Sequence, residues 1–391
     1  MALRSSAVFL SLALSAHAAN VTPEAAQVST LITTPLAIEG LTSDDAANLY
    51  APGRTPGVGL PCPVWRTSIE APALTVVGLL PAPSASTQCS PSGLAFGPDG
   101  RLYVAEGDRI LRFLPDATSP PIAEVFASGV PGTNGLAFDR AGSLWTGDGT
   151  TGEGRIWRID PQGVAREVFR VQAMANLVNV TMGTGGVGRD IRTLPPGTIA
   201  VTPTSRNAAN TLGSQPLVAN GLAFDRDGNL FIADTARGAI WRVRVHPNGS
   251  VAPATGCDTT FPPNTLCLEH VLVAHPLLEG IDGIALDVAG NIWGVENERN
   301  AIVVTTTDRR VIEVFRNPPD ETTRLRNGGP LEFPASPVIA GNRFCTSNSD
   351  GNRRDNSPSA AGELGGTGQP RGKITCIDQP LAIPGMSLPV R

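Results

Sequence analysis

Five residues with oxygen-bearing side chains recur at the first position of one repeated line of sequence. The line is clearest as NGLAFDRDGNLFIAD at 220–234, and it returns from residues 39, 92, 134 and 282. The first residues of these lines are Glu39, Ser92, Asn134, Asn220 and Asp282. None carries an imidazole or a thiol, and carboxylate and amide oxygens are the ligands that hard cations such as calcium prefer. If the fold brings the five positions together, they could form one site for a divalent cation.

An Asn or Asp before Gly also makes an ordinary turn, which is the simplest alternative for each position taken singly. A turn signal should be similar in every copy, whereas this position varies while its surroundings stay constant. The fifteenth position behaves differently, since it is acidic in four copies: Glu106, Asp148, Asp234 and Glu296. We interpret these four acids as hydrogen-bond acceptors within turns and between repeats, and not as ligands.

The repeated line has the pattern of a β-hairpin. Short apolar residues follow a Gly, and then come a turn of the D-R-D-G or G-P-D-G kind and a second run with an aromatic residue. Strand-like stretches such as 154–160 and 165–171 follow and bring each repeat to about four strands. The lines start 53, 42, 86 and 62 residues apart, and a four-stranded propeller blade needs roughly 40–50 residues.

These spacings predict an all-β fold, a six-bladed β-propeller with four-stranded blades around a central channel. A β-sandwich with coincidental hairpins is the alternative, and five gap-free copies of one line argue against it. The 86-residue interval holds either a further blade or, as we prefer, an insertion at about 172–216. Residues 336–348 and 372–378 would supply strands of the sixth blade, with Ser336 as a guess for its ring residue. Residues 31–38 would pair with that blade and close the ring.

The composition and the N-terminus indicate an exported, turn-rich β protein. The 391 residues include 43 Gly and 35 Pro, and a net charge of −5 leaves no basic surface for nucleic acid. Residues 1–18 have the pattern of a signal peptide cleaved near Ala18, with an N-terminal anchor as the alternative. We expect a secreted or periplasmic monomer without a membrane span. Residues 19–34 would form a lead-in, and residues 35–385 a single propeller domain.

Six cysteines remain after such a cleavage, and an even number in an exported protein suggests disulfides. Sequence neighbours suggest the pairs Cys62–Cys89, Cys257–Cys267 and Cys345–Cys376, which is one of the fifteen pairings that six cysteines allow. Their spacings do not match a zinc site.

The ordered Glu, Asn, Asn and Asp on successive lines, with the segments NGLAF…DGNLFIADT and DGIA…GNIW, resemble the regucalcin/gluconolactonase family of six-bladed propellers. The chain is also similar to diisopropyl fluorophosphatases and, more distantly, to paraoxonases. The resemblance covers residues 35–378 and implies calcium, or another divalent cation such as magnesium, manganese or zinc, at the channel mouth. It implies that Glu39, Asn220 and Asp282 are core ligands, and that Asn134 is a fourth ligand or a substrate contact.

The resemblance further implies hydrolysis of a small-molecule lactone or related ester, with Asp282 as general base or nucleophile beside the cation. Ser92 occupies a ring position but is a poor ligand, so we assign it, together with Asn134, to substrate binding. No residue matches the substrate-orienting Arg of the aldonolactonases, which leaves the substrate open.

Other chemistry has little support in the sequence. His246, His270 and His275 lie outside the repeated lines, and no G-x-S-x-G elbow is present. The GTGGVG segment at 183–188 matches a dinucleotide fingerprint only formally, since no βαβ unit surrounds it. Two other functions remain open. The lines also resemble NHL-type repeats, which favours a non-catalytic binding scaffold, and a strictosidine-synthase-like branch would perform condensation, although its catalytic Glu has no match here.

Overall fold

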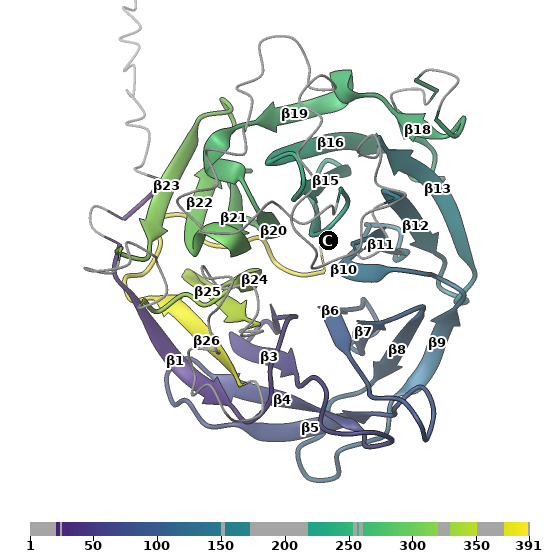
Figure 1. The fold of residues 1–391 in the computed structure, drawn as a ribbon, viewed down its shortest axis with the longest axis vertical. Helices are drawn as coiled ribbons and strands as arrows, with labels where there is room; N and C mark the ends of the chain where they lie inside the picture. The colour runs from purple at the N-terminus through teal and green to yellow at the C-terminus, as the bar shows by residue number, and fades with distance from the viewer. Residues whose placement is uncertain are drawn as a thin grey trace, which may run out of the picture.

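Six sheets surround a central axis, as Figure 1 shows. The structure is a computed structural model that describes residues 21–23, 26–149, 153–172, 218–252, 256–257, 261–319, 329–349 and 371–389. The predicted six-bladed β-propeller is confirmed. The predicted signal peptide and all but the first residue of the predicted insertion lie outside the described residues.

Blades 1, 2 and 5 are simple four-stranded sheets whose strands follow chain order from the axis outward. Blade 1 consists of β2 (Thr42–Ser43), β3 (Asn48–Pro52), β4 (Cys62–Ser68) and β5 (Thr75–Leu80). Blade 2 consists of β6 (Pro91–Phe96), β7 (Leu102–Glu106), β8 (Arg109–Phe113) and β9 (Glu124–Ser128). Blade 5 consists of β20 (Ile281–Leu286), β21 (Ile292–Glu296), β22 (Ala301–Thr305) and β23 (Val311–Arg316).

Blades 3 and 4 each carry an additional short strand. Blade 3 consists of β10 (Thr133–Phe138), β11 (Leu144–Asp148), β12 (Arg155–Ile159), β13 (Ala165–Val171) and β18 (Thr265–Leu266). Blade 4 consists of β14 (Leu222–Phe224), β15 (Asn229–Asp234), β16 (Ala239–Val245), β17 (Val251–Ala252) and β19 (Val271–Ala274). The described helical segments are the 3-10 turns η4 (Leu268–His270), η5 (Pro276–Leu278) and η6 (Asn297–Arg299). None of the described helices is long and apolar enough to cross a membrane.

Blade 6 closes the ring with strands from both ends of the chain. β24 (Pro334–Ala340), β25 (Arg343–Asn348) and β26 (Gly372–Ile377) come from the C-terminal part, and β1 (Val28–Thr34) adds the outer strand. β1 pairs antiparallel with β26, from Val28 opposite Ile377 to Thr34 opposite Gly372. The predicted closure is thus confirmed, and it covers the edge of β26 that would otherwise be open.

The repeated D-R-D-G text makes the inner hairpin turn through the side chain of its first Asp. In blade 4, Asp225 Oδ1 accepts hydrogen bonds from the backbone N–H groups of Asp227 (2.9 Å) and Asn229 (2.8 Å). Gly228 has a φ of +82°, a left-handed conformation that favours glycine. The pairing of β14 with β15 follows from this local chemistry.

Aromatic side chains from the repeated lines fill the contacts between neighbouring blades. Tyr103 of blade 2 meets Phe138 of blade 3 edge to face, with ring centroids 5.0 Å apart. Trp145 of blade 3 meets Phe224 of blade 4 in the same way at 5.8 Å. The aromatic near the middle of each second strand therefore packs the blades against one another, a role that keeps the repeat constant.

The three predicted disulfides are present: Cys62–Cys89, Cys257–Cys267 and Cys345–Cys376. Cys345 and Cys376 lie directly opposite each other on the neighbouring strands β25 and β26. This bridge therefore reinforces the blade that closes the ring.

Candidate metal centre

The first residue of each repeated line lies at the start of an innermost strand. Ser92, Asn134 and Asp282 are the second residues of β6, β10 and β20. Asn220 lies two residues before β14, and Glu39 lies three residues before β2.

The glycine that follows each first residue shows that these positions are neighbours around the axis. A Cβ atom added to Gly135 would lie 2.8 Å from the carbonyl oxygen of Asn220. One added to Gly221 would lie 2.6 Å from the carbonyl oxygen of Asp282. The same close approach joins three further pairs: Gly40 with Ser92, Gly93 with Asn134, and Gly283 with Ala335. The six positions thus follow one another around the axis, and five glycines make the approach sterically feasible.

The sixth ring position belongs to Ala335, so the guess of Ser336 is wrong. Thr133, the residue before Asn134, lies opposite Asp148 in blade 3, and Pro334 lies opposite Asn348 in the same way in blade 6. Ala335 therefore corresponds to Asn134, and Ser336 takes the place of the following glycine. The sixth blade lacks the repeated sequence, so nothing in the sequence marks its first position to the exact residue.

Asn134 and Asn220 touch each other through their side-chain amides. Asn134 Nδ2 donates to Asn220 Oδ1 at 2.5 Å, and the two residues are 7% and 2% exposed. Asn220 Nδ2 in turn donates to Thr235 Oγ1 at 3.1 Å. The Thr235 hydroxyl donates to the carbonyl oxygen of Ile281 at 2.6 Å. A hydrogen-bonded chain therefore runs from blade 3 through blade 4 to the residue before Asp282 in blade 5.

Asp282 is buried and one of its carboxylate oxygens is held by a neighbouring amide. Asn297 Nδ2 donates to Asp282 Oδ2 at 3.1 Å, and Asn297 is fully buried. Asn297 Oδ1 is also buried, and it has no hydrogen-bond partner among the described residues. The contact limits the directions in which the Asp282 carboxylate can point.

Glu39 makes an ion pair with Arg54, whose guanidinium also donates to Ser90 Oγ at 2.9 Å. The side chains of Arg54 and Glu39 are 28% and 20% exposed, so the pair lies at the rim of the buried ring. A cation bound at the ring would compete with Arg54 for the Glu39 carboxylate.

Arg54, Thr235 and Asn297 are site residues that our sequence reasoning missed. Each stands at the sixteenth position of its line, directly after the fifteen residues that form the repeat. Each contacts the first-position residue of its own blade: Glu39, Asn220 and Asp282, respectively. The sequence does contain a signal for these residues: a polar side chain directly follows the fifteenth position in these three lines.

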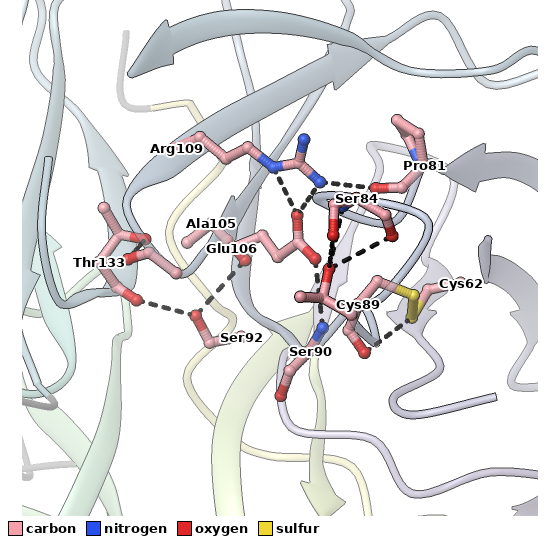
Figure 2. A network of polar contacts seen from close by, with 12 residues as sticks. Cys62, Pro81, Ser84, Cys89, Ser90, Ser92, Ala105, Glu106, Arg109 and Thr133 are labelled. Atoms are coloured by element: carbon pink, nitrogen blue, oxygen red, sulfur yellow. Dashed lines mark hydrogen bonds and ion pairs between the residues drawn. A yellow bond between two sulfur atoms is a disulfide. The ribbon is translucent and has the colours of Figure 1, made fainter. Parts of the chain in front are cut away.

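Ser92 uses its hydroxyl hydrogen within the protein. Figure 2 shows the Ser92 hydroxyl between the carbonyl oxygens of Thr133 and Ala105, at 3.1 Å and 3.5 Å. The residue is 7% exposed, and these contacts tie blade 2 to blade 3. Its assignment to substrate binding stays a prediction.

The acids at the fifteenth position pair mainly with arginines of their own blade. Glu106 binds Arg109, as Figure 2 shows, Asp148 binds Arg155 at 2.8 Å, and Asp234 binds Arg237 at 2.8 Å. These are turn contacts between the second and third strands, so they serve the blade and not the ring. The fourth acid, Glu296, is fully buried, and neither carboxylate oxygen has a hydrogen-bond partner among the described residues. Burial raises its pKa well above the usual range.

The three histidines among the described residues lie away from the innermost strands. His246 follows β16, His270 ends η4, and His275 precedes η5. His275 Nδ1 accepts a hydrogen bond from the backbone of Leu277 at 3.1 Å, a local capping contact. Burial lowers the pKa of His275.

An apolar cavity continues from the ring glycines along the axis. Its volume is about 900 Å³ including its opening to solvent, and its walls are inner-strand residues such as Leu136, Phe138 and Ile284. Met386, Leu388 and Pro389 line it from the C-terminal segment, which Figure 1 shows crossing to the centre of the molecule. The polar atoms of the ring are thus set above an apolar channel.

The donor set fits a hard divalent cation. The described residues contain no group of three or more His, Cys, Asp or Glu side chains placed to hold a metal ion together. The ring instead combines amides with carboxylates, and the Asn134 and Asn220 amides already converge at hydrogen-bond distance. Such mixed oxygen sets suit calcium better than soft metals. Glu39 joins the set only if it exchanges its Arg54 partner.

Comparison with known proteins gives this site a family context. A model of the SMP-30/gluconolactonase/LRE-like region matches residues 183–331. The resemblance to this family is thereby confirmed. No curated protein matches the chain.

Solved structures share the fold at low sequence identity. A luciferin-regenerating enzyme aligns with a TM-score of 0.55 at 14% identity, covering 93% of this chain and 98% of its own. The calcium-binding protein regucalcin from Agrobacterium tumefaciens gives 0.55 at 16% identity, covering 93% and 97%. A PQQ-bound aldose sugar dehydrogenase from Streptomyces coelicolor gives 0.52 at 16% identity, covering 90% and 99%. Since the same fold supports different chemistry, function has to be argued from the site.

Proposed function

We propose that the chain is an exported hydrolase of a lactone or related ester that depends on a divalent cation, with calcium as the first choice. The observation that carries the proposal is the ring itself, in which Asn134, Asn220 and Asp282 are successive and buried. Asn134 donates to Asn220, and Asn220 is connected through Thr235 to the backbone of Ile281, the residue before Asp282. The match to the SMP-30/gluconolactonase/LRE-like family supports the reaction class. The three disulfides support export, because such bonds persist in oxidising compartments.

In this proposal Glu39, Asn220 and Asp282 hold the cation, and Asn134 is either a fourth ligand or a contact to substrate. The cation, when bound, would polarise the carbonyl oxygen of the ester and stabilise the charge that develops on it. Position sixteen of blade 3 is Gly149, where an added Cβ would overlap the Asn134 amide. The sixteenth position of blade 3 therefore supplies no side chain to Asn134, whose amide instead donates to Asn220.

Asp282 acts on the nucleophile. Its carboxylate either accepts a proton from the attacking water or attacks the carbonyl carbon directly. The Asn297 amide holds Oδ2 of this carboxylate at 3.1 Å, which restricts its rotation during the reaction. Burial of Asp282 limits hydration, so that its charge acts strongly on a bound ester.

The proposal is tested by hydrolysis of a panel of aldono-, γ- and δ-lactones and aryl esters. Wild type would be assayed with calcium and with a chelator, beside Asp282→Asn, which keeps the shape of the side chain. We expect kcat/KM to fall by about 10²–10⁴-fold in the variant, the usual contribution of a positioned base. Asp308→Asn, a change on an exposed turn between β22 and β23, is the control and should leave kcat/KM unchanged.

Chelation should abolish turnover and leave the circular dichroism spectrum unchanged. Full activity of Asp282→Asn on a substrate that wild type hydrolyses would remove Asp282 from the mechanism. A folded protein that binds no divalent cation and hydrolyses no member of the panel would favour the binding scaffold.

A further inference from the structure

The Thr235 hydroxyl determines which way the Asn220 amide faces. A hydroxyl has one hydrogen to donate, and Thr235 Oγ1 lies 2.6 Å from the carbonyl oxygen of Ile281, a group that can only accept. Thr235 must therefore accept its second hydrogen bond, the 3.1 Å contact with Asn220. The Asn220 atom that faces Thr235 is then the NH₂ group, and Asn220 Oδ1 lies on the other side, toward Asn134.

We propose that Thr235 is a positioning residue of the metal centre, which keeps the Asn220 oxygen available to a cation. An amide can present either oxygen or nitrogen at one place, and only the oxygen binds calcium. Thr235 and Asn220 are 0% and 2% exposed, so no bulk water can replace the hydroxyl. The inference rests on the proposed function, because it assigns a role to Thr235 at the same cation site.

The sixteenth position supports this role independently of Thr235. Asn297 occupies it in blade 5 and donates to Asp282 Oδ2, whereas Thr235 occupies it in blade 4 and accepts from Asn220 Nδ2. Arg54 occupies it in blade 1 and pairs with Glu39. Thr235 and Asn297 therefore contact the two expected ligands Asn220 and Asp282 from the same position of their lines, whereas Arg54 would have to release Glu39 to a cation. Outer groups of the Thr235 and Asn297 kind orient metal ligands generally.

The test is the calcium affinity of Thr235→Val, measured by isothermal titration calorimetry and by the rise in melting temperature on adding calcium. Valine keeps the shape of threonine but neither donates nor accepts. We expect affinity to fall about 10- to 100-fold, the usual effect of removing an outer partner of a metal ligand. Thr235→Ser restores the hydroxyl and should bind calcium nearly as well as wild type. If the valine variant does not fold, Thr235→Ala removes the same hydroxyl and carries the same expectation.

Two comparisons separate positioning from general stability. Thr305 is 1% exposed and its hydroxyl has no hydrogen-bond partner among the described residues, so Thr305→Val is the matched control and should not change the affinity. In the Asn220→Asp background, both terminal atoms of the side chain are oxygens. Either one can face the cation, so Thr235 is not needed to orient this side chain. The loss caused by Thr235→Val should therefore disappear in that background, whereas a structural defect would persist.

The outcomes are distinguishable. The positioning role is supported if wild type binds calcium and if Thr235→Val lowers the calcium affinity only in proteins that keep Asn220. Equal affinities of wild type and Thr235→Val, or an equal loss in both backgrounds, overturn that role and leave the proposed hydrolase intact. Failure of wild type itself to bind calcium, magnesium, manganese or zinc overturns both proposals.

Discussion

Glu296 is the acid at the fifteenth position that lacks the arginine partner seen in the other blades. Arg299 stands three residues after it, as Arg237 stands three residues after Asp234, but Arg299 donates to Glu313 at 2.8 Å. Glu296 is left fully buried, and desolvation raises the pKa of its carboxyl well above the usual range. A buried carboxyl without a partner destabilises the folded state whenever it has to ionise.

We predict that Glu296→Gln stabilises the protein at neutral pH. Because the folded-state pKa lies above the unfolded value of 4.5, the wild type loses stability as pH rises through that value toward the folded pKa. Ionisation of this buried carboxyl is disfavoured in the folded state, so the stability of Glu296→Gln relative to the wild type should increase as pH rises from the unfolded pKa toward neutral. Below the unfolded pKa the gain should shrink, because both states of the wild type are then protonated.

Urea denaturation of both proteins at a series of pH values measures this difference. Glu124→Gln, at a side chain that is 55% exposed on β9, should show no comparable pH dependence. A gain for Glu296→Gln that stays constant from acid to neutral pH would contradict the explanation by ionisation.

The innermost strands approach one another through a column of glycines, and this is where the fold has least tolerance. The contact is between backbones, since Gly221 faces the carbonyl oxygen of Asp282 and the Cα of Gly283. Backbone atoms cannot rotate away as a side chain can, so an added methyl group has to push whole blades apart.

Gly221→Ala should therefore destabilise the protein more than Gly294→Ala. A Cβ at Gly221 would lie 2.6 Å from the Asp282 carbonyl oxygen, whereas a Cβ at Gly294 would first meet the Ile281 Cδ1 at 3.0 Å, the end of a flexible side chain. We expect the difference in unfolding free energy to be about 1–3 kcal/mol, the usual range for overpacking. Chemical denaturation measures it, and equal stabilities would mean that the blades can move apart at little cost.

The closed ring depends on β1, which joins the N-terminal part of the chain to the last blade. β1 pairs with β26 over Val28–Thr34, and Cys345–Cys376 holds the next two strands of the same blade together. Without β1, the edge of β26 would expose unpaired backbone groups.

A chain that begins at Pro35 should thus be much less stable than one that begins at Ala26, which keeps β1. Each lost backbone hydrogen bond costs about 1 kcal/mol, so removing β1 should cost several kcal/mol and promote association through the open edge. Thermal unfolding and light scattering measure the two effects. A synthetic peptide of residues 28–34 should restore stability in part, whereas identical melting of the two chains would show that β1 does not close the ring.

The repeated lines and their spacing predict the six blades and the ring of first positions. The strand-like residues 31–38 predict the closing strand, and the order of the cysteines predicts the three disulfides. Each of these predictions follows from local features of the sequence: turn sequences, alternating apolar and polar residues, and the order of the cysteines. In the sixth blade the repeated pattern is lost, and the sequence alone points to Ser336 and not to Ala335. Blade 6 has the same register shift after its first position as blades 2, 3 and 5, but it lacks their repeated sequence, so only the pairing of Pro334 with Asn348 identifies Ala335.

Which side chains meet depends on the packing of the blades. The repeat is sufficient to show that Glu39, Asn220 and Asp282 hold the same position in their blades, because they hold the same position in lines of equal length. That Arg54, Thr235 and Asn297 stand behind them depends on how each second strand ends beside its first. The same holds for Glu296 and Arg299. They have the three-residue spacing of the ion pair Asp234–Arg237, but Arg299 pairs with Glu313 and not with Glu296. The partner of each side chain depends on its rotamer and on its position in the packed blade. The separation of two residues along the sequence does not determine either of these.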